Sequence, residues 1–297
     1  MVKIVCLGLF GIMLSLASLG QTTDKATGPA FDYHRDFKAI LEQTQADTSK
    51  LFYDSLLVRF LQNDTSFTKA ETLALMIGFT ENQYFQPLED MEKEEEIFDH
   101  NKSAEFHEAI EKGRPYLDTH PLSLLVLREV SFAYTRLGLY YGKNGQFDSA
   151  VICQDSAKYF MDLNDKVMEA MIYSGKGRSP ETAIFSLGLA DGEYFIPNVG
   201  FTIEKKTADW IHKKDFMEII QAADESGESK IFFFAIQHAK AKIDDDKADA
   251  MAMKKKNKKP VKKKSKQKAT PTSKAAVENP VPESPPATTD SIPAIQP

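Results

Sequence analysis

Apolar side chains recur at helical spacing through the first half of the chain. Phe37, Ile40 and Leu41 show this spacing near the beginning, and later segments repeat it. Thr68 precedes Glu71 by three residues, just ahead of an apolar run. This is a capping-box sequence, which is typical of a helix start. The pattern therefore predicts a helical N-terminal half.

Residues 131–163 show the most regular pattern, helix, tight turn and helix. Small residues stand where two helices would cross closely, so the segment resembles one tetratricopeptide repeat. It departs from that repeat at Gln154, where an apolar residue is usual, and at Asp162, where a closing proline is expected. Such repeats bury their core by stacking on one another. We therefore interpret this single unit as a local helical hairpin.

After Pro180 the apolar pattern changes to a period of two, which is typical of strands. The acidic turn signal at residues 191–193 would close the first strand, and a loop containing Gly227 would join the last two. The predicted strands are residues 181–189, 200–210, 215–223 and 230–239. Helices followed by strands predict an α+β fold, in which an N-terminal helical (tetratricopeptide-like) layer packs on a C-terminal antiparallel β-sheet.

The two ends of the chain differ from the rest. Lys3 and an apolar run precede Ser18 and Gly20, which is the order of a secretory signal peptide cleaved before Gln21. An uncleaved anchor is the alternative, but the run is shorter than the ~20 residues that span a bilayer. We therefore expect export across an inner membrane, to the periplasm or the extracellular space.

Composition and apolar pattern together divide the chain into five regions. The predicted regions are a signal peptide at 1–20, a short leader at 21–30, a helical region at 31–172, a β-rich region at 173–250 and a disordered tail at 254–297. The tail is rich in lysine and then in Pro, Ser, Thr and Ala, and it has too few large apolar side chains to form a core.

The net charge divides along the same boundary. The whole chain carries −6, and the tail, with 11 Lys and 3 acidic residues, carries +8, so residues 1–253 carry −14. The favoured interpretation is a solvated tail that acts only as a spacer, and binding of the cationic tail to an anionic surface is the alternative. We expect no nucleic-acid partner for an exported protein. The helical region is a candidate surface for a protein partner.

Cysteine chemistry is limited in this chain. Cys6 lies inside the apolar run of the signal peptide and not at its cleavage point, which argues against a lipoprotein. Cys153 is then the only cysteine of the mature chain, so it cannot form an internal disulfide. We interpret Cys153 as a small buried hydrophobic side chain.

Residues 174–179, "SGKGRS", have the composition of a phosphate-binding loop. They lack the spacing of that loop, and a helix precedes them while a strand follows. Gly175 and Gly177 could still present backbone N–H groups to an anion, with Lys176 and Arg178 beside them. The favoured interpretation is a structural turn between the helical region and the β-rich region.

Other catalytic patterns are weak. His100 and His107 can share a helix face, but no zinc-protease motif is present, and the aspartates at 244–246 lack the spacing of a calcium loop. No serine-nucleophile motif is found. We interpret the late aromatic residues, Trp210 among them, as sheet core rather than a sugar platform. We predict no catalytic residue, no metal ion and no cofactor.

Several segments together resemble an uncharacterised family of secreted proteins from Bacteroidota, known as domain of unknown function number four-nine-one-nine. They include "MIYSGKGRSPETAIF" and "DGEYF", and the resemblance spans roughly residues 31–238. Lys176 stands where many members carry an acidic residue. The matching residues are Ser174, Gly175, Gly177, Ser179, Thr182, Ala183, Glu193 and Tyr194. The resemblance implies a compartment and an architecture but no activity.

The function that these features favour is a non-enzymatic exported envelope protein with a binding or scaffolding role. Two alternatives stay open: a periplasmic hydrolase using carboxylates near residues 173–194, and a binder of an anion or small ligand at the SGKGRS turn. The ligand-binding residues that we predict are Ser174, Gly175, Lys176, Gly177, Arg178, Ser179, Thr182, Glu193 and Tyr194.

Overall fold

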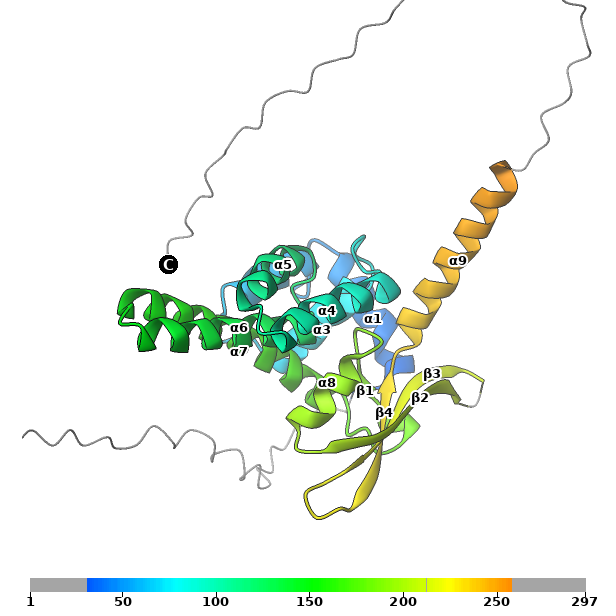
Figure 1. The fold of residues 1–297 in the computed structure, drawn as a ribbon. Helices are drawn as coiled ribbons and strands as arrows, with labels where there is room; N and C mark the ends of the chain where they lie inside the picture. The colour runs from blue at the N-terminus through cyan, green and yellow to red at the C-terminus, as the bar shows by residue number, and fades with distance from the viewer. Residues whose placement is uncertain (1–30, 212, 258–297) are drawn as a thin grey trace, which may run out of the picture. The chain divides into compact units, whose positions relative to one another are not determined.

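The structure, a computed structural model, describes residues 31–211 and 213–257 (Figure 1). Its first helices are α1 (Tyr33–Gln45), α2 (Tyr53–Leu61), α3 (Lys69–Phe79), α4 (Pro87–Lys102), α5 (Phe106–Thr119), α6 (Leu124–Lys143) and α7 (Phe147–Ser174). The later elements are the short 3-10 helix η1 (Pro180–Thr182), β1 (Ile184–Phe185), α8 (Asp191–Asn198), β2 (Thr202–Ile211), β3 (Asp215–Ala223), β4 (Ser229–Ala235) and α9 (Gln237–Asn257). The predicted α+β class is therefore confirmed.

The predictions for the chain ends fall mostly outside these residues. The signal peptide, the leader and residues 258–297 of the tail are not described by the structure. Helix α9 extends to Asn257, four residues into the segment predicted to be disordered. None of the described helices is both long enough and apolar enough to span a membrane.

Local sequence signals explain where several helices begin. Thr68 and Glu71 form the predicted capping box at the start of α3, with Thr68 N donating to Glu71 Oε2 at 2.8 Å. Ser123 caps α6 by accepting a hydrogen bond from the Val126 N–H. Helix α5 continues through Pro115 and ends at Thr119, two residues before Pro121.

Helices α6 and α7 form the predicted hairpin (Figure 1). A Cβ atom at Gly138 would lie 3.3 Å from Cys153 Cβ, so glycine lets the two helices approach closely. Cys153 is buried, as expected, and burial raises the pKa of its thiol. Without a proline at Asp162, α7 continues to Ser174.

The strands form one sheet in the order β1-β4-β3-β2. The pairs β2–β3 and β3–β4 are antiparallel, with Met217 opposite Asp209 and Ala235. Strand β1 pairs in parallel with β4, Ile184 opposite Phe234, so the sheet is mixed rather than wholly antiparallel.

Three of the predicted β-region elements differ from the observed ones. The first predicted strand shortens to Ile184–Phe185, because Pro180 begins a 3-10 turn. The predicted turn at 191–193 is instead the first turn of α8, whose Phe195 and Ile196 side chains are buried against the sheet and helices. The last predicted strand ends at Ala235, and its remaining residues begin α9.

One hydrophobic core joins the helical region to the sheet. It includes Leu75 of α3, Val126 of α6 and Phe234 of β4, each buried. Helix α8 lies between the two layers, since it contacts α6 as well as β2 and β3. The prediction that Trp210 belongs to the sheet core is wrong. Its side chain is 47% exposed, and β2, which carries it, is an edge strand.

The close approach of α5 to α6 gives a stability prediction. A Cβ atom at Gly113 would overlap the buried Val130 side chain. We expect Gly113→Ala to lower the free energy of unfolding by about 1–3 kcal/mol through overpacking. Gly142→Ala is the matched control, because a Cβ there meets nothing nearer than 3.9 Å. It should raise stability by up to about 1 kcal/mol through helix propensity. Urea unfolding curves of the two variants should therefore shift in opposite directions; shifts of the same sign would contradict the packing argument.

Candidate functional site

The SGKGRS turn uses its own polar groups to hold the fold together. Gly177 has a positive φ of 65°, its N–H donates to Thr182 O at 2.6 Å, and its carbonyl accepts from the Phe233 N–H at 2.9 Å. Ser174 Oγ accepts from the Phe185 N–H at 2.8 Å and donates to the backbone at the end of α7. The turn is thus bonded to η1, β1 and β4.

Gly175 and Ser179 of the turn are also held by contacts within the protein. A Cβ atom at Gly175 would overlap the backbone carbonyls of Thr182 and Ala183. The Ser179 N–H points at Thr182 Oγ1 at 3.2 Å. Two of the N–H groups that an anion cradle would need, those of Gly177 and Ser179, therefore already have acceptors inside the protein.

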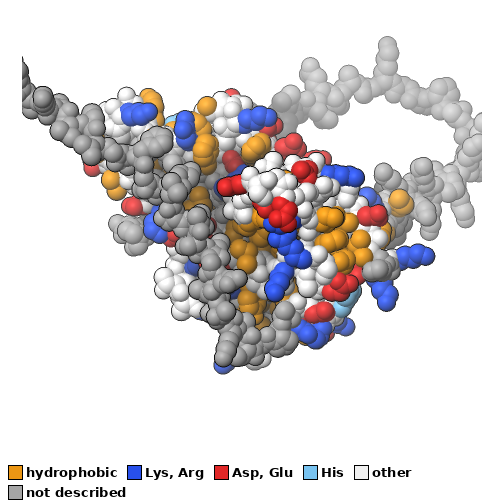
Figure 2. Space-filling view, turned by 90° about the horizontal axis from the view of Figure 1, so that it is seen from below, with side chains coloured by type: hydrophobic (Ala, Val, Ile, Leu, Met, Phe, Trp, Pro, Cys, Tyr) orange, Lys and Arg blue, Asp and Glu red, His pale blue; other side chains and the backbone are white. Residues whose placement is uncertain are grey.

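The two cations of the turn lie on the surface. Arg178 is exposed, and its guanidinium carbon lies 4.4 Å from the centre of the buried Phe232 ring and 6.0 Å from that of Phe201. Lys176 is exposed. On the face shown in Figure 2, Lys and Arg side chains lie among hydrophobic ones. Arg178 thus covers an aromatic part of the sheet, which is a packing role.

Glu193 and Tyr194 lie in a different place, on α8. Glu193 forms an ion pair with Lys206 of β2. The Tyr194 ring lies under Arg128 of α6, 5.6 Å from the guanidinium carbon, and burial raises the pKa of its hydroxyl to about 12. The predicted site residues therefore form two separate sets of contacts: those of the SGKGRS turn with η1, β1 and β4, and those of Glu193 and Tyr194 with β2 and α6. They do not define one pocket.

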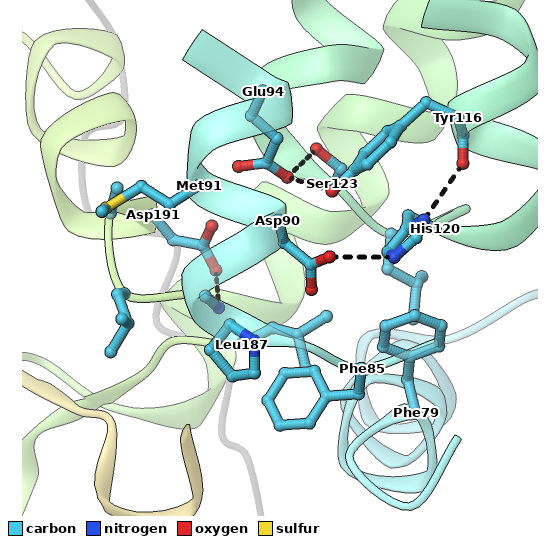
Figure 3. A pocket seen from close by; sticks show the side chains of 15 residues that line it. Phe79, Phe85, Asp90, Met91, Glu94, Tyr116, His120, Ser123, Leu187 and Asp191 are labelled. Carbon is cyan, nitrogen blue, oxygen red and sulfur yellow. Dashed lines mark hydrogen bonds and ion pairs between the residues drawn. The ribbon is translucent and has the colours of Figure 1, made fainter. Parts of the chain in front are cut away.

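A group of polar side chains that we did not predict lies where α4, α5 and α6 meet the loop before α8 (Figure 3). We call this group the polar seam. The polar seam consists of Asp90, Glu94, Tyr116, His120, Ser123 and Asp191.

His120 is the basic member of the polar seam. Its Nε2 atom lies 2.9 Å from Tyr84 O and 3.1 Å from Asp90 Oδ1. Its Nδ1 atom lies 2.7 Å from Thr119 Oγ1 and 3.3 Å from Tyr116 O. Burial lowers the pKa of His120, but Asp90 and the two carbonyls outweigh it, so the net pKa is raised. Both ring nitrogens face acceptors, which suits a protonated imidazole.

Glu94 is the acid at the centre of the polar seam. Its Oε1 atom accepts hydrogen bonds from Ser123 Oγ at 2.6 Å and from Tyr116 Oη at 3.2 Å (Figure 3). Burial, together with the charge of Asp191, raises the pKa of Glu94 to about 8 despite these bonds. The carboxyl group therefore binds a proton at neutral pH.

Asp191, the member of the polar seam on α8, and Glu218 of β3 are also buried acids. Asp191 Oδ2 accepts from the Gly188 N–H at 2.7 Å, and burial raises its pKa. Glu218 of β3 is 2% exposed, and its carboxyl group lies against Gly192, where a side chain would not fit. Burial raises the pKa of Glu218 to about 8. No hydrogen bond of normal geometry reaches either of its oxygens within the described part of the chain.

The cavity beside the polar seam is small. Its volume is about 30 Å³, and Phe79, Phe85 and Leu187 supply apolar walls. A space of this size holds one or two water molecules and no sugar or peptide residue. The carboxyl groups and the imidazole can therefore store protons, but this cavity leaves no room for a substrate beside them. In residues 31–211 and 213–257, no three His, Cys, Asp or Glu side chains are placed to hold a metal ion.

The sequence carried only a weak signal for the polar seam. Asp90 and Glu94 are four residues apart, so they share a face of α4, but they stand among many other acids of that helix. His120 lies at the end of α5, beside a proline, in a segment that looked like a boundary. In such an acidic segment, the neighbouring residues in the sequence do not show which carboxylates are buried and which face solvent.

The chain belongs to a family described as a domain of unknown function (DUF4919), whose sequence model matches residues 38–245. No curated protein and no solved structure matches the chain. The match covers the helices from α2 to α8, the sheet, the SGKGRS turn and the polar seam, so all of these features lie inside the family's domain.

The raised pKa values predict how stability depends on pH. An unfolded glutamate has a pKa near 4.3, so between about pH 5 and pH 8 the folded chain holds protons that the unfolded chain has lost. The free energy of unfolding should then fall as pH rises, by up to roughly 1.4 kcal/mol per pH unit for each group.

Glu94→Gln and Glu218→Gln should remove this pH dependence one group at a time. At pH 8 each variant should have a higher melting temperature than the parent, because the parent must keep a proton on a buried carboxyl group that the unfolded chain releases. At pH 5 the difference should be much smaller. Glu95→Gln, on the exposed side of α4, is the matched control and should change little at either pH. Thermal melts at the two pH values measure this, and an equal gain at both would show that the carboxyl groups are ionised in the fold.

Proposed function

We propose that this chain is an exported, non-enzymatic binding protein of the cell envelope, and that the outer face of α6 binds a protein partner. The single observation that carries the proposal is an exposed apolar strip on that helix. Phe132, Leu139 and Tyr140 are 44%, 53% and 60% exposed. Leu139 and Tyr140 follow Phe132 by seven and eight residues, so the three lie on one face of α6.

Cations complete this surface, which we call the α6 face. Arg136 lies between two aromatic rings, its guanidinium carbon 5.7 Å from the centre of the Phe106 ring and 6.0 Å from that of Phe132. Neither Arg136 nor Lys143 makes an ion pair with an acid of the described chain. Exposed rings beside unpaired cations favour a partner segment that carries aliphatic side chains next to a carboxylate.

The hydrolase alternative has less support. It is predicted to use carboxylates near residues 173–194; of these Asp191 is buried with a raised pKa, and the nearby Glu94 and Glu218 also have raised pKa values, as a general acid requires. A hydrolase also needs space for a substrate, and the cavity of about 30 Å³ does not supply it. A binding role needs only the exposed surface, and for this reason we favour it.

Export rests on the sequence pattern of residues 1–20. If that pattern is a cleaved signal peptide, protein released from the periplasm of a Gram-negative host by osmotic shock should begin at Gln21. N-terminal sequencing or intact-mass measurement checks this. Recovery of the chain with Met1 still present, or only in the cytoplasmic fraction, would contradict export by this route.

The α6 face can be tested by site-specific photo-crosslinking in cells that express the full chain. A photoreactive amino acid at Tyr140 should give one defined adduct, and the crosslinked peptide should contain Asp or Glu near aliphatic residues. The same amino acid at Asp155, on the outer side of α7, should not give that adduct.

Charge reversal then distinguishes specific binding at the α6 face from crosslinking that occurs only because Tyr140 is exposed. Arg136→Glu should reduce the Tyr140 adduct at least about tenfold, which corresponds to roughly 1.4 kcal/mol. Arg114→Glu, an exposed reversal on α5, is the matched control and should leave the adduct unchanged. An adduct that survives Arg136→Glu, or that both reversals remove equally, would contradict a specific role for the α6 face.

A further inference from the structure

A large groove lies between α1, the connection from α3 to α4, and α9. Its volume is about 640 Å³, within the range of small-ligand sites and far larger than the cavity beside the polar seam. We call it the α9 groove. It lies away from the α6 face, because none of its lining residues comes from α5, α6 or α7.

The walls of the α9 groove carry an excess of negative charge. Four carboxylates line it with a single lysine, and that lysine, Lys242, is paired with Asp246 at 2.8 Å. Glu81, Asp245 and Asp249 make no ion pair with any residue that the structure describes. His238 adds no positive charge, because burial lowers its pKa to about 4. The α9 groove therefore suits a cation.

Two aromatic side chains line the α9 groove. The rings of Tyr33 and Phe37 are stacked with their centres 4.6 Å apart, and both side chains are half-buried. Ring faces attract ammonium groups and also pack against alkyl chains. Gln237 adds a buried oxygen, Oε1, that accepts no hydrogen bond from the described residues. A buried acceptor without a donor favours a ligand that brings N–H groups.

The spacing of the carboxylates indicates how many cationic groups the ligand carries. Asp245 and Asp249 are one helical turn apart on α9, about 6 Å along the axis. This is comparable to the distance between the two nitrogens at the ends of a four-carbon chain. Glu81, on the connection from α3 to α4, offers a third carboxylate. From these observations we propose that the α9 groove binds a linear polyamine, with its nitrogens at the carboxylates and its methylene groups over Tyr33 and Phe37.

Isothermal titration calorimetry of the full chain with spermidine tests the proposal directly. Spermidine and putrescine should bind with a stoichiometry of one, and butylamine, which has one nitrogen, should bind at least about tenfold more weakly. Binding should weaken as salt is raised, because the carboxylates are exposed. Absence of spermidine binding at low salt would overturn the proposal, and so would equal affinity for butylamine and putrescine.

Matched variants locate the site on the chain. Asp245→Asn combined with Asp249→Asn should weaken spermidine binding at least about tenfold. Asp244→Asn is the control, because Asp244 lies outside the groove and pairs with Lys240; it should leave the affinity within about twofold. Far-UV circular dichroism confirms that each variant is folded. Equal weakening by both sets would indicate non-specific attraction and overturn the assignment to the α9 groove.

Two further measurements separate polyamine binding from the partner surface and from a protein occupant of the groove. Arg136→Glu on the α6 face should bind spermidine normally, so failure of the partner proposal does not affect this one. A short lysine-rich peptide tests for a protein occupant, and spermidine should displace it if it binds in the same place. If the peptide binds and spermidine does not, the groove docks a protein segment and the polyamine proposal is wrong.

Discussion

Burial of the Phe185 side chain ties the two ends of the described chain to the sheet. Strand β1 has only two residues, yet Phe185 is fully buried and lies in an aromatic cluster drawn from both of those ends. Its ring centre lies 6.2 Å from that of Phe37 in α1 and 4.8 Å from that of His238 in α9. Two backbone pairings with β4 alone could not hold such a strand. The aromatic contacts stabilise it, and they also fix α1 and α9, which form two walls of the α9 groove.

The polar seam places a second constraint on the same packing. Helix α8 must lie close to both α6 and the sheet, and this buries Glu94, Asp191 and Glu218 in a poorly hydrated space. Ionised carboxylates there would cost several kcal/mol, so burial raises the pKa of all three groups, and Glu94 and Glu218, with pKa values of about 8, bind protons at neutral pH. The same groups that resemble an acid catalyst therefore belong to the packing between layers.

Much of the fold follows from local pattern, and the exceptions have physical causes. The helices up to Ser174, the capping box at Thr68 and the hairpin around Gly227 depend on short-range spacing, which a sequence displays directly. Helix α8 was missed because its acidic first turn also has turn composition, and only burial of Phe195 selects the helix. The polar seam and the α9 groove were missed because each joins residues far apart in sequence, and periodicity carries no information on that pairing.

The parallel pairing of β1 with β4 has a consequence for the order of folding. Ile184 pairs with Phe234, which lies fifty positions later in the chain, and the Tyr33 hydroxyl contacts His238 across a separation of 205 residues. Loop-closure entropy makes such contacts slow compared with helix formation. A chain that is made from its N-terminus therefore forms its helices first, with their apolar faces uncovered until the last strand and α9 are added. A newly made chain therefore passes through a stage in which its apolar helix faces are uncovered, and the length of that stage is set by the final sixty or so residues of the folded part.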